Sequence, residues 1–376
     1  MLLLLANFSV STCFGAFFIF PLYVIVIGGT KTSIGILMGT MGLASVIVRP
    51  WVSTAVDKIG RKKSFGIGSL ILTFVCAAHV YTFQDIQSAF IPLLVLRFLF
   101  GAGFALCLVA AFTYASDMAP PNRLNEGISI FGIMGVLGVA VGPISAEWLV
   151  HSYGYREMFI GAFLIALTSL ITSFYLKETV IKDTANVEGT FLEILGHPTV
   201  FAMFITGCCF GFGYSAHCGF IAPFAELQGM LVSPYFTAYS ASAIISRIFL
   251  GKVVDRFGES KILPAAFVIN TAGFIILAAV SSSFWFPIAG ACGGLGHGML
   301  VPGMLSVAVR KVNKQDRGKA TGVVTGGVDS GLFIGSILLG FIGEQFGFTA
   351  IFCTSALFLF LGLIIFMLSQ KINGVK

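Results

Sequence analysis

The sequence predicts an all-α membrane protein with twelve transmembrane helices in two pseudo-symmetric six-helix bundles. Three observations carry this prediction. The chain of 376 residues is 57% hydrophobic and only 10% charged, whereas soluble domains have roughly 25% charged residues. Apolar segments follow one another along the whole chain. A polar pattern at the end of one apolar segment also returns 198 residues later.

The composition indicates a lipid-facing surface, because a soluble protein of this length would need a charged exterior. The net charge of +6 comes from basic residues spread over many short loops, without interleaved aromatic residues, so a nucleic-acid partner is not expected. The eight cysteines lie inside apolar segments without a C-x-x-C pair, which favours packing roles over disulfides or metal ligation. The first residues lack a basic region, so no cleaved signal peptide is expected.

Apolar segments of roughly 20–27 residues are long enough to cross about 30 Å of hydrocarbon. We expect them at 3–27, 33–56, 64–83, 88–115, 126–150, 155–176, 198–224, 231–254, 261–282, 286–309, 319–342 and 347–370. The longest polar stretch lies between the sixth and seventh segments. The sequence therefore predicts an N-terminal six-helix bundle in 1–176, a cytoplasmic linker in 177–196 and a C-terminal six-helix bundle in 197–376.

The distribution of basic residues predicts the orientation. If both termini are cytoplasmic, seventeen of the 22 Lys and Arg residues lie in inner loops and the tail, and only Lys31 and Arg156 lie in outer loops. The remaining three, Arg49, Arg97 and Arg247, lie within segments. Cytoplasmic loops carry such an excess. We therefore expect a multi-pass protein of the cell (inner) membrane with both termini in the cytoplasm.

An internal duplication is visible in the polar residues. The stretch from Asp57 to Lys63 has a counterpart from Asp255 to Gly258, 198 residues later. Arg49 and Arg247 each lie eight residues before the corresponding Asp. Internal repeats of this kind are typical of secondary transporters, which change the exposure of a central site.

These residues resemble the major facilitator superfamily over essentially the whole chain, which implies the major facilitator fold. The family signature G-x-x-x-D-x-x-G-R-[KR] after the second span is matched from Ser53 to Lys62, with Ser53 in place of Gly. The second copy has Glu259 in place of Arg. The resemblance implies a cytoplasmic latch between the halves, in which Arg61 pairs with an acid at the end of the fourth helix. The latch residues would be Asp57, Arg61, Asp117, Gly251, Asp255 and Arg256.

Two further motifs resemble proton-coupled members of this family. The first, R-x-x-x-G-x-G, begins at Arg97, and the second, G-x-x-x-G-P, is the core of a fifth-helix signature common in exporting antiporters. That signature continues toward G-G in the family, whereas this chain has Ala146-Glu147. The segment 120–127 and Lys177-Glu178-Thr179 look like the drug-exporter branch. The expected conformational-hinge residues are Gly101, Gly103, Gly138, Gly142 and Pro143.

Proton coupling requires a titratable group near the bilayer centre. Arg97, His297 and Asp329 each lie roughly ten residues, about 15 Å, into their spans. Asp329 is the preferred proton carrier, because a desolvated carboxyl group can be protonated near neutral pH, and His297 titrates there without any shift. The alternatives are a structural acid in a network with Ser330 and Thr325, and a packing histidine.

Other polar residues are candidates for contact with a solute. His217 and Tyr214 on the seventh span, together with Arg97, are expected to line a substrate cavity. The alternative for Arg97 is a structural arginine that bonds neighbouring carbonyl groups. Glu147 and Glu226 lie near the outer ends of helices, and we expect them to be solvated rim residues.

The sequence thus predicts a secondary active transporter that works by alternating access, with proton-coupled antiport (efflux) of a small organic or amphiphilic solute. The alternatives are a proton symporter or uniporter that takes up a small metabolite, a lysolipid flippase, or a non-transporting receptor. An enzyme is not expected, because the chain has no P-loop, no metal-ligand cluster and no nucleophile–base pair at a recognisable spacing. The expected partners are the solute, protons and lipid, without cofactor or metal, and the expected state is a monomer.

Overall fold

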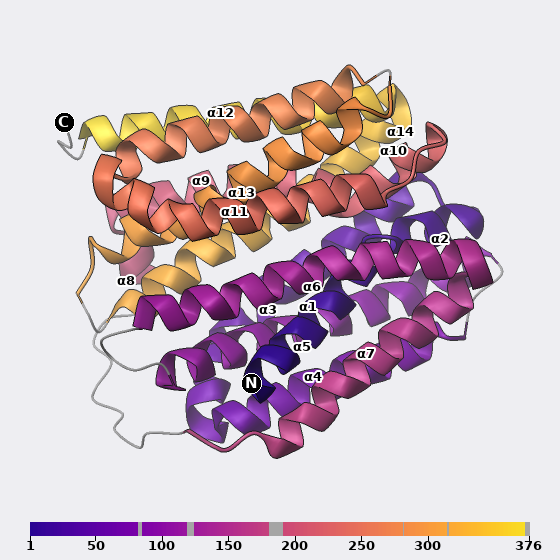
Figure 1. The fold of residues 1–376 in the computed structure, drawn as a ribbon, viewed down its shortest axis with the longest axis horizontal. Helices are drawn as coiled ribbons and strands as arrows, with labels where there is room; N and C mark the ends of the chain where they lie inside the picture. Colours follow the sequence, from indigo (N-terminus) through magenta and orange to yellow (C-terminus); the bar gives the residue numbers. More distant parts are fainter. Residues whose placement is uncertain (82–84, 119–123, 180–190, 281, 314–315, 373–376) are drawn as a thin grey trace. The chain divides into compact units, whose positions relative to one another are not determined.

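The computed structural model describes all residues except 82–84, 119–123, 180–190, 281, 314–315 and 373–376. It gives only the helical backbone, not the side chains, of 53, 54, 57, 124–130, 191–192, 249–257 and 372. All regular secondary structure in the described residues is helical, which confirms the all-α prediction (Figure 1).

Seven helices are described in the first half of the sequence. They are α1 (Leu2–Ala16), α2 (Phe20–Val26), α3 (Lys31–Ile59), α4 (Arg61–His79), α5 (Ile86–Met118), α6 (Leu124–Tyr153) and α7 (Tyr155–Tyr175). Helices α1 and α2 are the two parts of the first apolar segment, because tighter i→i−3 hydrogen bonds replace the α-helical ones between Ala16 and Phe20.

The second half repeats this order after a short additional helix. It contains α8 (Phe191–Leu195), α9 (Pro198–Gly219), α10 (Ile221–Leu227), α11 (Ser233–Phe257), α12 (Glu259–Ala278), α13 (Trp285–Val309) and α14 (Arg317–Ile372). Helices α9 and α10 are the two parts of the seventh segment, as α1 and α2 are of the first. Helix α14 covers two expected segments and is interrupted at Gly347, where the backbone is not helical.

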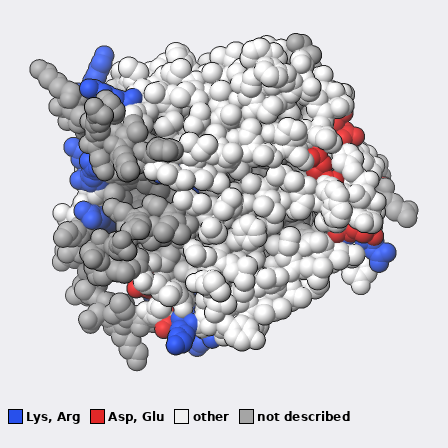
Figure 2. Space-filling model, viewed as in Figure 1, with Lys and Arg blue, Asp and Glu red and all other residues white. Residues whose placement is uncertain are grey.

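Apart from α8, which lies in the expected linker, the helices fall on the twelve expected apolar segments, with ends that differ by a few residues. Within the described residues, nine helical stretches are apolar and long enough to cross a membrane, and the last of them, 317–371, has room for two crossings. Large apolar side chains are exposed on several helices, for example Trp51 (67%), Phe74 (62%) and Ile91 (65%). In Figure 2, the charged side chains of the described residues lie toward the left and right ends of the visible face. Such a surface suits contact with lipid.

The chain forms two compact units. Unit 1 contains 1–182 and 221–236, and unit 2 contains 183–220 and 237–376. Helix α10 and the first turn of α11 therefore belong to unit 1, although they follow α9 of unit 2 in the sequence. The predicted division into bundles 1–176 and 197–376 with a linker stays a prediction.

Small residues let the first helix of each half approach its main neighbour closely. In unit 1, α1 packs on α6, and a Cβ added at Gly138 would lie 2.6 Å from the carbonyl oxygen of Phe8. In unit 2, α9 packs on α14, and a Cβ added at Gly331 would lie 2.8 Å from the amide nitrogen of Phe212. Close backbone approach of this kind replaces hydrophobic association in membranes. The first and fifth spans are thus paired like the seventh and eleventh.

Glycines with positive φ mark the same turns in both halves. Six occur in the described residues, and they form three corresponding pairs: Gly28 and Gly229, Gly60 and Gly258, and Gly154 and Gly347. The first pair follows the short helices α2 and α10. The other two pairs connect consecutive spans through a single residue. Because side chains with a Cβ rarely adopt these φ values, the duplication is preserved in the turns as well as in the helices.

Candidate functional site

Arg61 and Asp117 form an ion pair at one end of unit 1. Arg61 is the first residue of α4, and its Nε lies 3.0 Å from Oδ2 of Asp117 near the end of α5. Its Nη1 also donates to the carbonyl oxygen of Val56 at 3.3 Å. The side chains of Arg61 and Asp117 are only 12% and 18% exposed. The structure therefore contains the contact that the motif suggested, whereas its role as a latch in transport stays a prediction.

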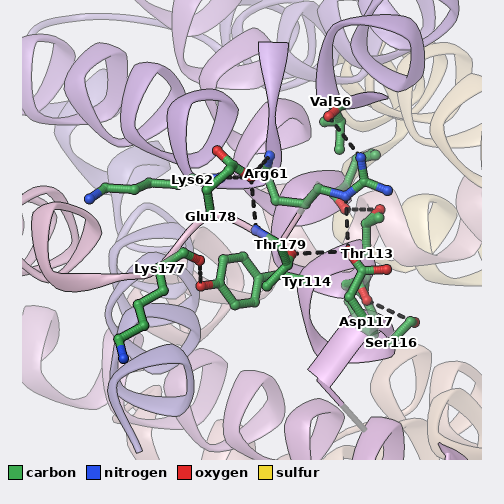
Figure 3. A network of polar contacts seen from close by, with 12 residues as sticks. Val56, Arg61, Lys62, Thr113, Tyr114, Ser116, Asp117, Lys177, Glu178 and Thr179 are labelled. Atoms are coloured by element: carbon green, nitrogen blue, oxygen red, sulfur yellow. Dashed lines mark hydrogen bonds and ion pairs between the residues drawn. The ribbon is translucent and has the colours of Figure 1, made fainter. Parts of the chain in front are cut away.

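The carboxylate of Glu178 completes this network (Figure 3). Its Oε1 accepts hydrogen bonds from the backbone amides of Arg61 at 2.8 Å and Lys62 at 3.4 Å. These amides are at the N-terminus of α4, where the preceding Gly60 has no side chain to cap the helix, and an anion is stabilised there. The adjacent Thr179 donates its hydroxyl to Oδ2 of Asp117 at 3.0 Å.

Sequence reasoning did not include Glu178 and Thr179 in this network. The segment from Lys177 to Thr179 was noted only for its family resemblance. The signal that could have located it is an acid directly after the sixth span, on the same membrane side as Arg61. The segment joins the end of α7 to the start of α4 and the end of α5, so three helix ends in unit 1 share one network.

The remaining latch residues lie outside the described side chains. Asp57 is at the end of α3, and Gly251, Asp255 and Arg256 are at the end of α11, where only the helical backbone is described. Their contacts stay predictions.

Unit 2 contains an ion pair of opposite polarity at the equivalent position. Oε1 of Glu259, the first residue of α12, accepts a hydrogen bond from Oγ of Ser306 at 2.8 Å and lies 2.9 Å from Nη2 of Arg310. Glu259 is the residue that departs from the family signature. The departure therefore reverses the charges of the pair and preserves the connection between the helices.

Arg97 is enclosed by apolar side chains in unit 1, with 1% of its surface exposed. Its guanidinium carbon lies 5.4 Å from the ring centroid of Phe17, 5.3 Å from that of Phe20 and 5.2 Å from that of Phe100. Its Nη2 lies 3.3 Å from the sulfur of Met38 and 3.6 Å from that of Met41. Cation–π contact of this kind stabilises a desolvated cation. The aromatic cage also contains the buried His79, which the sequence did not single out.

The expected hinge residues lie where backbones are close together. A Cβ at Gly101 would lie 3.0 Å from the carbonyl carbon of Met41 on α3, and one at Gly103 would lie 3.1 Å from the carbonyl oxygen of Gly68 on α4. Gly138, Gly142 and Pro143 face α1. These contacts are compatible with sliding helices and with static packing, so the hinge role stays a prediction.

Unit 2 brings three of the candidate residues together with one that the sequence missed. We call Tyr214, His217, Tyr239 and His297 the Tyr–His cluster. The rings of His217 and Tyr239 stack with centroids 4.0 Å apart, and Tyr214 lies 5.3 Å from His217 and 5.0 Å from His297. The Tyr239 hydroxyl and Nδ1 of His297 form a short hydrogen bond.

Three helices supply the Tyr–His cluster. Tyr214 and His217 come from α9, Tyr239 comes from α11, and His297 lies 12 residues, about 18 Å, from the start of the 25-residue α13. Tyr214 and His297 are half-buried, whereas His217 and Tyr239 are 2% and 4% exposed. The cluster thus combines hydroxyl and imidazole groups with aromatic surfaces within unit 2, halfway along α13.

Two observations connect the Tyr–His cluster with its surroundings. Phe210 extends its aromatic surface, with a centroid 5.3 Å from that of His297. Arg247 is near enough to interact electrostatically with Tyr214, Tyr239 and His297. The sequence signal that could have indicated Tyr239 is its position eight residues before Arg247, in a helix rich in serine.

Asp329 is half-buried on α14. Gly327 and Gly331, which contact α9, lie two residues before and after it. Two residues correspond to about 200° around an α-helix, so Asp329 is on a different face of α14 from these glycines. The hydroxyls of Thr325 and Ser330 donate to backbone carbonyls of the preceding turn. The proton-carrier role of Asp329 stays a prediction. Among the described residues, no group of three or more His, Cys, Asp or Glu is placed to hold a metal ion.

The broken first and seventh spans, two helical units and polar groups buried within them define a membrane transport protein. The chain belongs to the Major Facilitator Superfamily, whose sequence profile matches residues 2–235 and 230–373. It is therefore a multi-pass membrane transporter and not an enzyme.

Individual relatives are distant but extend over nearly the whole chain. An uncharacterised MFS-type transporter of Methanocaldococcus jannaschii is 23% identical over 93% of this chain and 92% of the relative. The multidrug resistance protein MdtG of Salmonella typhi is 24% identical over 95% and 90%. A solved structure of a mutant nucleoside transporter NupG has a TM-score of 0.79 at 14% identity and covers 98% of both chains, a likeness of fold.

Proposed function

We propose that this protein is a secondary active transporter that works by alternating access and exports a small organic or amphiphilic solute in exchange for protons. The Tyr–His cluster carries the proposal, because it gathers hydrogen-bonding groups and aromatic rings halfway along α13. Two interrupted spans in corresponding positions, α1–α2 and α9–α10, also support it, since broken helices accompany the central site of many transporters.

The cluster suits a solute with an aromatic or extended apolar part. The half-buried rings of Tyr214 and His297 offer stacking surfaces, and the phenol and imidazole groups offer donors and acceptors. Asp329 and His297 are the proposed proton carriers, and Arg97 the proposed third polar centre of the coupling mechanism. Export is supported by the similarity to a protein named for multidrug resistance, at 24% identity.

We further propose a cell (inner) membrane location with both termini in the cytoplasm and a monomeric state. The basic residues Arg61, Lys62 and Lys177 lie at the end of unit 1 where α4 begins and α7 ends. This fits the excess of Lys and Arg that cytoplasmic loops carry.

Proton movement in proteoliposomes with an internal pH dye tests the proposal. Cationic, zwitterionic and anionic organic solutes are added one at a time, and protein-free liposomes serve as the control. Proton flux opposite to solute flux would establish antiport. Flux in the same direction would replace it by a symporter. Solute movement without proton flux would replace it by a uniporter or a lysolipid flippase.

A further inference from the structure

A buried carboxylate joins α6 to the start of α11 within unit 1. Glu147 was expected to be a solvated rim residue, which is wrong, because it is only 5% exposed. Its Oε1 accepts a hydrogen bond from the backbone amide of Val232 at 2.5 Å, and its Oε2 accepts one from the amide of Ser233 at 2.8 Å. The Ser233 hydroxyl also donates to Oε2. We call these three hydrogen bonds the Glu147 clasp.

The clasp lies at the opposite end of α6 from the Arg61–Asp117 network. Glu147 is 23 residues after Leu124, where α6 begins, which corresponds to about 35 Å along the helix. Unit 1 thus has a polar connection at each end, and the two connections share no residue.

The clasp holds a segment that interrupts unit 2 in the sequence. The segment 221–236 follows α9 of unit 2 and leads into the rest of α11, which again belongs to unit 2. Helix α10 of this segment contacts α2, and the rings of Phe18 and Phe236 lie 5.4 Å apart. Ala225 and Phe236 are fully buried. Any movement that separates segment 221–236 from unit 1 must therefore break the Glu147 clasp.

A carboxylate can be satisfied in both states of such a movement. When the segment is in place, the amides at the start of α11 and the positive end of its dipole stabilise the ionised group. When the segment leaves, water can take over the same hydrogen bonds. An apolar residue would instead favour the closed state permanently, because it gains nothing from water.

We propose that Glu147 is a gating residue, whose clasp keeps segment 221–236 on unit 1 and whose release opens this end of the protein during transport. The proposal rests on the alternating-access function proposed above. It also gives a role to the departure from the family's fifth-helix G-G signature at Ala146-Glu147: Glu147 positions segment 221–236.

The test measures the exposure of the segment directly, without any solute. An Ala225→Cys reporter is reacted with maleimide-polyethylene glycol in detergent, and the unmodified chain gives the background from its own cysteines. We expect Glu147→Ala to raise the labelling rate about tenfold, since hydrogen bonds to a charged group are lost. Two milder changes should raise the labelling rate less. Glu147→Gln keeps a hydrogen-bond acceptor, and Ser233→Ala leaves both hydrogen bonds from the backbone amides.

The matched control is Glu226→Gln, the same chemical change at an exposed carboxylate on α10 itself. It should leave the labelling rate unchanged. A rate that stays unchanged in Glu147→Ala, with normal elution on size exclusion, overturns the proposal. If that variant does not fold, an unchanged rate in Glu147→Gln overturns it instead. Because the assay uses no solute or proton gradient, its result is independent of whether antiport is found.

Discussion

Glu259 occupies the position in the second half of the chain that Arg61 occupies in the first. Each is the first residue of a helix and directly follows a glycine with positive φ. Arg61 lies 3.0 Å from Asp117, and Glu259 lies 2.9 Å from Arg310. Each pair joins the start of one span to the end of the next. The two halves therefore use the same connection with the charges exchanged.

This reversal predicts that the Arg61 pair can be inverted. Arg61→Glu and Asp117→Arg should each destabilise the protein by about 1–3 kcal/mol, because a largely buried charge loses its partner. The double variant should recover part of this loss. Thermal unfolding in detergent measures the effect. If the double variant loses as much stability as the two single variants together, the prediction is contradicted.

The pair in unit 2 should contribute less. The Arg310 side chain is 63% exposed, and exposed ion pairs contribute about 0–1 kcal/mol. We expect Arg310→Ala to lower the stability by no more than this, with an effect that decreases at high salt. Unfolding at low and high ionic strength gives the comparison, with Arg61→Ala measured alongside. An equal loss of stability in Arg310→Ala and Arg61→Ala would disprove the expectation that the unit 2 pair contributes less.

Tyr239→Phe tests the Tyr–His cluster. The variant keeps the ring that stacks on His217 and removes only the hydroxyl that bonds to His297. We expect a few-fold rise in KM for the solute identified in proteoliposomes, because one hydrogen bond is worth about 0.5–1.5 kcal/mol. Tyr175→Phe, at a side chain that is 70% exposed, is the matched control. An unchanged KM and turnover would remove Tyr239 from the site.

Asp329→Asn tests the proposed proton carrier. The amide cannot release a proton, so we expect proton-coupled flux to disappear while the protein remains folded. Proton flux in proteoliposomes and elution on size exclusion measure the two effects separately. Full coupling in the variant would assign Asp329 a structural role.

Gly142→Ala tests the close approach of α1 and α6. The added methyl group would lie 2.6 Å from the carbonyl carbon of Gly15, so the helices must separate. Overpacking costs about 1–3 kcal/mol, and thermal unfolding should show it. Gly318→Ala is the control, because nothing lies within 4 Å of its added Cβ. Equal stability of the two variants would show that the contact is soft.

The sequence predicted local features better than contacts between distant segments. The spans were predictable because each depends on its own apolar run. The pair of Arg61 and Asp117 was predictable because the resemblance to the family implied both of its ends. Nothing in the pattern showed that Tyr239 meets His297, or that Glu147 reaches Ser233, 86 residues away. Such contacts depend on how helices pack. The misjudged Glu147 shows that closeness to the end of a span does not imply contact with water.

The single-glycine turns have a consequence for how this protein is made. Gly60, Gly154, Gly258 and Gly347 each leave one residue between two spans. A connection that short keeps the end of one helix beside the start of the next. We therefore expect each such pair of helices to enter the lipid as a hairpin during biosynthesis. Four of the twelve spans, namely the first, fourth, seventh and tenth, have no partner of this kind and can be inserted singly.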